Sequence, residues 1–89
     1  MNKQKHKWKI TDDIVAFYLY KYGSNSEIEI ASKKLGIKLD SLKMRIENFR
    51  YLDRNKGLRK YSKQTELIYL SKNGLTKNEL KAEFELALS

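Results

Sequence analysis

The side chains with the most evident chemistry are the lysines and arginines between Lys33 and Lys63. This stretch holds eleven cations and three anions, a net charge of +8, which equals the formal charge of the whole chain. Residues 1–32 carry +1 and residues 64–89 carry −1. Because the excess is concentrated rather than spread evenly, it favours a polyanionic partner, above all nucleic acid. A solvated charged face is the plainer alternative.

Apolar residues inside this basic stretch recur at helical spacing. Leu42, Ile46 and Phe49 follow an i, i+4, i+7 pattern, which predicts an amphipathic helix from about residue 40 or 41 to about residue 53. The opposite face would carry Asp40, Met44, Glu47, Asn48 and Tyr51, with Ser41 and Lys43 toward its edges. We therefore expect one side of this helix to face the core and the other to face a partner.

The outward face is mixed in chemistry, which suits base edges better than phosphates. An asparagine such as Asn48 can bridge an adenine edge, Ser41 can bond to several bases, and Met44 can touch a thymine methyl group. For Asn48, a hydrogen bond to a local backbone group is an equal alternative. Tyr51 and the later Tyr61 either touch nucleic acid or pack over helix ends.

The remaining cations would bind phosphates, which position a protein on DNA without reading its sequence. These predicted phosphate contacts are Lys33, Lys34, Lys38, Arg45, Arg50, Arg54, Lys56, Arg59 and Lys60.

Glycines and capping residues divide the first part of the chain. A helix is expected between Thr11, as N-cap, and Gly23. Ser26 and Glu29 have the spacing of a capping box and predict the start of a second helix, which Gly36 ends.

Beyond the third helix, "DRNKGLRKYS" reads as an exposed connection. A short extended piece at 58–61 would occupy the place of a wing. Ser62 is the expected cap of a fourth helix, and Thr76 with Glu79 forms a capping box for a fifth. The sequence thus predicts a small all-α domain of about five helices.

The connection between the second and third helices has the layout of a helix-turn-helix. Ala31 would lie against the partner helix, Gly36 would allow a left-handed turn, and Ile37 would fill the angle between the helices. We expect this domain to span 10–89, preceded by a basic flexible arm at 1–9. That arm either enters a minor groove or serves as a solubilising tail.

The segment "SLKMRIENFRYLDRNKGLRKYSKQTELIYL" resembles the amino-terminal domain that precedes the nuclease module in a group of bacterial HNH restriction endonucleases. Those domains often read M-K-x-x-N-F-R-x-L-D, then a glycine-containing loop, then S-K and a helix. The counterparts here are Met44, Arg45, Asn48, Phe49, Arg50, Leu52, Asp53, Gly57, Leu58, Ser62 and Lys63. Upstream, Trp8 followed by "TDDIVAFYLYKYG" looks like the opening helix of that family.

The likeness covers roughly residues 8–86 and implies a helix-turn-helix or winged-helix module that helps to locate DNA. It implies no nuclease chemistry, because His6 is the only histidine, whereas the HNH motif requires paired histidines, an asparagine and a bound metal. The chain therefore looks like the recognition part of such an enzyme standing alone.

Catalysis finds little support elsewhere in the sequence. The acidic pairs at 12–13 and 27–29 suit helix N-termini, where anions are stabilised, better than an acid/base pair. Cysteine is absent, and no glycine-rich phosphate loop or metal-ligand spacing occurs. We expect a non-enzymatic protein with no cofactor and no small-molecule substrate.

No window of the sequence has the roughly 18 apolar residues of a membrane span, so a cytoplasmic location is expected. The leading hypothesis is a protein that reads double-stranded DNA through the helix at 38–51. The alternatives are a protein-interaction module of a phage or mobile element and, less favoured, an RNA-binding protein.

Overall fold

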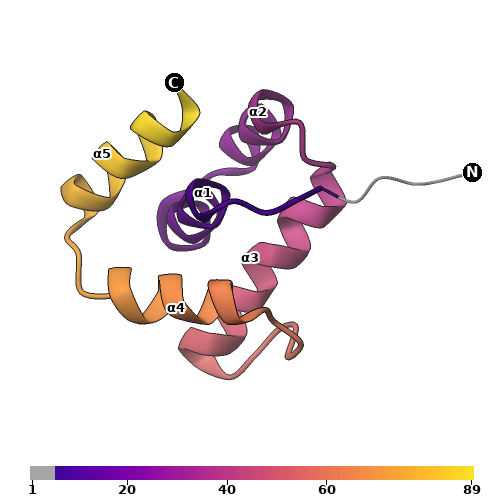
Figure 1. The fold of residues 1–89 in the computed structure, drawn as a ribbon, viewed down its shortest axis with the longest axis vertical. Helices are drawn as coiled ribbons and strands as arrows, with labels where there is room; N and C mark the ends of the chain where they lie inside the picture. The colour runs from indigo at the N-terminus through magenta and orange to yellow at the C-terminus, as the bar shows by residue number, and fades with distance from the viewer. Residues whose placement is uncertain (1–5) are drawn as a thin grey trace, which may run out of the picture.

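The computed structural model describes residues 6–89, which form five α-helices and, within that range, no strand (Figure 1). The helices are α1 (Ile10–Tyr22), α2 (Asn25–Leu35), α3 (Leu39–Arg54), α4 (Lys63–Lys72) and α5 (Lys77–Leu88). The expected all-α class and the number of helices are thus confirmed. The short extended piece predicted for 58–61 is wrong, because these residues form an irregular loop.

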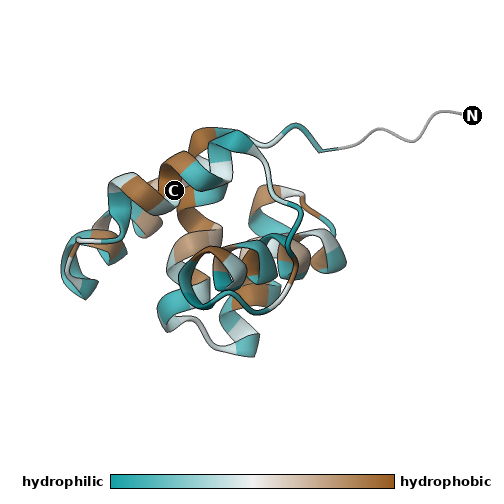
Figure 2. Cartoon of the chain, turned by 90° about the horizontal axis from the view of Figure 1, so that it is seen from below, coloured by the Kyte–Doolittle hydropathy of each residue, from teal (hydrophilic) through white to brown (hydrophobic). Residues whose placement is uncertain are grey.

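The first helix, α1, lies at the centre and contacts each of the other four (Figure 1). Every residue from Asp12 to Leu19 is buried, so this helix has no solvent-facing side over two turns. A helix that is apolar on all sides must be covered on all sides. The four remaining helices do this, and apolar and polar bands alternate along them (Figure 2).

Aromatic rings fill much of the core around α1. Phe17 and Phe49 are fully buried, with ring centroids 5.1 Å apart, and join α1 to α3. Tyr18 stacks on Phe84 at 4.2 Å and joins α1 to α5. Offset and tilted ring pairs of this kind add to the free energy of burying the rings themselves.

Two predicted helix starts are wrong by about two residues. The helix α1 follows Lys9 rather than Thr11, because the Asp12 carboxylate accepts a hydrogen bond from the Lys9 backbone N–H at 2.9 Å. The capping box of α2 uses Ser24 and Glu27, not the pair two residues later. Both candidate pairs have the same spacing, and the earlier one adds two residues of helix immediately after α1.

The later boundaries agree with the sequence prediction. The Ser62 hydroxyl caps α4 by accepting from the Thr65 backbone N–H at 3.1 Å. Thr76 and Glu79 form the predicted box at α5, with distances of 2.9 and 3.2 Å.

Candidate nucleic-acid interface

The turn between α2 and α3 orients the basic helix. Gly36 has φ 68° and ends α2 in the left-handed region, where a Cβ atom would be strained. Ala31 and Ile37, on either side of this turn, are buried at 0% and 2% exposure. The three residues thus have the burial and backbone geometry expected of them from the sequence.

The outward face of α3 is open to solvent at Lys43 and Met44 and again at its end, whereas the loop after α3 packs on the part between them. Met44 is 54% exposed, Lys43 and Arg54 are exposed, and Tyr51 is half-buried. Ser41 lies half-buried at the edge of this face. Of the seven residues predicted for the outward side, all except Asn48 therefore keep at least part of their surface free for a partner.

Most of the predicted phosphate contacts are exposed around this face. Arg50 is half-buried because its guanidinium pairs with Glu47 at 3.1 Å. The exposed ones are Lys33 and Lys34 at the end of α2, Lys38 before α3, Arg54 at its end, and Lys56, Arg59 and Lys60 after it.

Arg45 does not belong to this set, and its predicted phosphate contact is wrong. Its side chain is only 11% exposed and points inward, where Nε lies 3.4 Å from a carboxylate oxygen of Asp13. The guanidinium also donates to Ser62 Oγ at 3.0 Å and to Thr65 Oγ1, and stacks on the Trp8 ring at 3.9 Å. A charge with this many internal partners is held in the interior and is not available to a phosphate.

Asn48 is also unavailable, so its predicted role as a base reader is wrong. The residue is 8% exposed, and its side-chain Nδ2 donates to the carbonyl oxygens of Leu58 at 3.0 Å and Lys60 at 2.9 Å. A side-chain amide has two N–H donors, and both are used here. The alternative prediction, a hydrogen bond to a local backbone group, is correct only in that the acceptors are backbone carbonyls, because these lie 10 and 12 residues further along the chain.

The carboxylate of Asp13 is the centre of a buried polar cluster that sequence reasoning missed. It accepts from Gln64 Nε2 at 2.6 Å and Thr65 Oγ1 at 3.1 Å, besides its ion pair with Arg45. Burial raises the pKa of Asp13, and these partners offset that rise only in part. One signal was present in the sequence. Asp12 alone can accept the hydrogen bond from the unpaired backbone N–H at the start of α1, so Asp13 is left for a contact with another helix.

Residues 6–9, which were assigned to the arm, lie against the helices. The Trp8 backbone carbonyl accepts from Gln64 Nε2 at 3.1 Å, and the His6 ring nitrogen lies 2.8 Å from Asp12 Oδ2. The Trp8 ring packs against the core and under the Arg45 guanidinium, so this residue makes a structural contact. The first part of the predicted arm, residues 1–5, falls outside the described range.

A second carboxylate, that of Asp53, joins three helices near the end of α3. It accepts from Tyr20 Oη of α1 at 2.5 Å and from Tyr69 Oη of α4 at 3.0 Å. These hydroxyl donors lower the pKa of Asp53, while burial and the same contact raise the pKa of Tyr20 to about 12. The contact fixes the end of α3 next to the basic loop.

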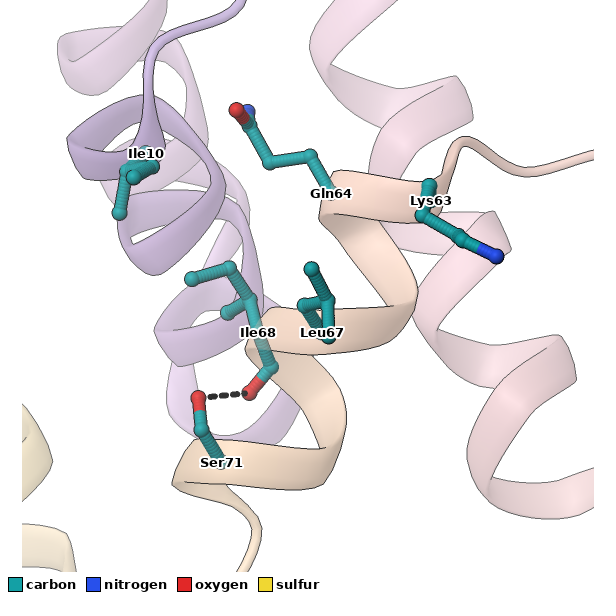
Figure 3. A pocket seen from close by; sticks show the side chains of 6 residues that line it. All are labelled: Ile10, Lys63, Gln64, Leu67, Ile68 and Ser71. Atoms are coloured by element: carbon teal, nitrogen blue, oxygen red, sulfur yellow. Dashed lines mark hydrogen bonds between the residues drawn. The ribbon is translucent and has the colours of Figure 1, made fainter.

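A hollow of about 430 Å³ lies between the start of α1 and the outer side of α4 (Figure 3). Ile10 borders it from α1, whereas Leu67 and Ile68 border it from α4. Leu67 is 59% exposed, and Leu70, also on α4, is exposed as well. This is a second surface, apolar instead of basic.

Residues 6–89 contain no group of three or more His, Cys, Asp or Glu side chains placed to hold a metal ion. None of the helices within this range is long and apolar enough to cross a membrane.

Comparison with protein-family models, curated proteins and solved structures finds no match to this chain. The resemblance to the HNH recognition domain therefore stays a prediction.

The Asp13→Ala variant is expected to lose about 3 kcal/mol of unfolding free energy, because removing one partner leaves the buried charge of Arg45 uncompensated. Urea denaturation followed by circular dichroism measures this loss. In the matched control Asp40→Ala, an exposed first-turn aspartate is removed, at a cost of less than about 1 kcal/mol.

An Asp13→Ala/Arg45→Met double variant should recover part of the loss, since no unpaired charge then remains in the interior. Equal stability of Asp13→Ala and Asp40→Ala would contradict the importance of the cluster.

The Asp53→Asn variant should be less stable by about 1 kcal/mol at neutral pH, a value reduced for partial exposure of the carboxylate. Because the folded-state pKa of Asp53 lies below the unfolded value of 3.8, its contribution is present above that pH. It is lost as the pH falls through the folded-state pKa.

Urea denaturation of wild type and Asp53→Asn between pH 7 and pH 3 tests the direction of this pH dependence. Glu85→Gln, a change at an exposed residue, is the control. The difference between wild type and Asp53→Asn should shrink toward low pH. A constant or growing difference would show that Asp53 does not act through its ionised form.

Proposed function

We propose that this protein binds double-stranded DNA, with the exposed face of α3 in the major groove and the surrounding cations on phosphates. The observation that carries the proposal is the placement of the exposed lysines and arginines. They border α3 at both ends and along the loop that follows, while the stretches 1–32 and 64–89 are close to neutral.

The shape of α3 supports this mode of binding. A helix with its side chains is about 10–12 Å across, and the major groove of B-DNA is about 12 Å wide. In this proposal α2, the Gly36 turn and α3 act as a helix-turn-helix, in keeping with the resemblance to the HNH recognition domains.

Because Asn48 and Arg45 are bonded within the protein, the residues that would contact base edges are Ser41, Lys43 and Met44. Only Lys43 belongs to the side-chain types that form two hydrogen bonds to one base, and none of the three is an asparagine, glutamine or arginine. Phosphate contacts therefore supply most of the affinity, and we expect discrimination among sequences to be modest.

A titration of duplex DNA at several salt concentrations tests the proposal. The logarithm of the association constant should fall linearly with the logarithm of salt concentration, by about 0.9 for each phosphate neutralised. Arg59→Ala removes one phosphate contact and should therefore make this slope less steep by about 0.9. The control Lys81→Ala removes an exposed cation of α5, remote from α3, and should leave the slope unchanged. Absent or salt-independent binding would refute DNA binding.

A second candidate function, capture of a partner protein, is favoured by the apolar hollow beside α4. The occupant we propose is an amphipathic helix with acidic residues next to its apolar stripe. Ile10 and Leu67 would contact the stripe, and Lys63 at the rim, with the exposed Lys9 next to Ile10, would face the acidic side chains.

Leu67→Asp is expected to abolish binding of such a helix without affecting DNA affinity by more than about twofold, since Leu67 lies outside the basic surface. Fluorescence polarisation with a designed Leu- and Glu-rich helical peptide measures it, with exposed Leu86→Asp of α5 as the matched control. Equal peptide binding by wild type and Leu67→Asp would contradict this role of the hollow.

A further inference from the structure

We infer that Asn48 is a positioning residue, which holds the loop at 55–62 as a preformed cationic ridge beside α3. The inference rests on the proposed function and specifies how one part of that surface is built. It assigns Asn48 a role in DNA binding that involves no contact with DNA.

The loop is fastened to α3 at close intervals along its length. Its first residue, Asn55, caps α3 in the left-handed conformation, and the Leu58 N–H donates to the Glu47 carbonyl at 3.3 Å. The two donors of Asn48 bind the carbonyls of Leu58 and Lys60.

Further contacts secure the carboxyl-terminal end of the loop. The Tyr61 ring lies against Tyr51 of α3, with centroids 6.0 Å apart. Ser62, the last residue, accepts a hydrogen bond from Arg45, which is itself held by the buried cluster.

Gly57 permits the close approach of this loop to α3. Its φ of 103° is open to glycine alone among ordinary residues, and a Cβ atom there would lie 2.7 Å from the Glu47 carbonyl oxygen. The path of the backbone thus depends on Gly57 at one point and on Asn48 at the next two.

These anchors act on the backbone and leave the cationic side chains free. Lys56, Arg59 and Lys60 are exposed, and the contact from Asn48 to Lys60 uses only the carbonyl oxygen. Hydrogen bonds from one side chain thus hold this loop in place, as strand pairing holds the loop of a wing. A surface that is already in its binding geometry avoids the ordering cost that a mobile loop incurs on binding.

The size of the effect follows from the populated fraction of the binding geometry. If Asn48→Ala lowers that fraction to between about one fifth and one tenth, the apparent Kd rises about 5- to 10-fold. All three cations remain, so the slope of affinity against salt should not change. Preference among DNA sequences should not change either, because no base contact is lost.

The experiment compares Asn48→Ala and Gly57→Ala with two matched controls. Asn78→Ala removes an exposed asparagine of α5, and Gly74→Ala adds a Cβ atom that meets nothing within 4 Å. Hydrogen exchange of the Leu58 amide in the free protein reports whether the loop is held. Binding to two unrelated duplexes at two salt concentrations reports affinity, slope and preference, and circular dichroism verifies folding.

Both test variants should show faster exchange at Leu58 and 5- to 10-fold weaker binding with an unchanged slope, while both controls should match wild type. Altered sequence preference in Asn48→Ala would overturn the inference in favour of base reading. Faster exchange with unchanged affinity would overturn it by removing the loop from the interface. If Asn48→Ala does not fold, Gly57→Ala, which keeps Asn48, still decides whether affinity needs a held loop, and faster exchange with unchanged affinity in this variant overturns the inference.

Failure of the proposed function gives a different result. If wild-type protein binds neither duplex, the DNA-binding proposal is refuted, and so is the role of the loop in binding. The exchange rates of the free proteins still decide whether Asn48 holds the loop.

Discussion

The ion pair between Asp13 and Arg45 is the contact on which the arrangement of α1, α3 and α4 depends. Asp13 is fully buried at the centre of the molecule, so its charge must be compensated by groups from neighbouring helices. Thr65 and Gln64 of α4 and Arg45 of α3 do this, and each must lie at a fixed position to reach the carboxylate. A buried pair contributes little net stability, but breaking it is costly, which favours one packing over its alternatives.

This pair also divides the cations of the basic stretch into two kinds. Arg45 is enclosed by Trp8, Asp13 and Ser62. Arg54 and Arg59, which belong to the same basic stretch, are open to solvent. The net charge of residues 33–63 therefore overstates the charge that a phosphate backbone would meet there, because Arg45 is neutralised by Asp13 from outside that stretch. The clustering of the exposed cations around α3, which is a property of the fold, supports DNA binding more directly than composition does.

The helices could be predicted from the sequence because periodic apolar residues, glycines and capping residues act locally. Phe49 and Ile37 were placed in the core on this basis, and both are buried. The errors in the candidate site concern Arg45 and Asn48, which flank the exposed face of α3. Whether an edge residue is covered depends on where α4 and the preceding loop pack, and helical phase carries no information on that.

Asn48 illustrates what a small helical domain gives up to place a loop. The chain has no cysteine to form a disulfide, and residues 6–89 supply no strand to support a wing. A long exposed loop would then be mobile, because few contacts offset its conformational entropy. Using both amide donors of Asn48 on the loop backbone restricts that motion but withdraws the one asparagine of α3, a side-chain type that can pair with an adenine edge. In the proposed mode of DNA binding, such an exchange would favour affinity for the DNA backbone over discrimination among bases.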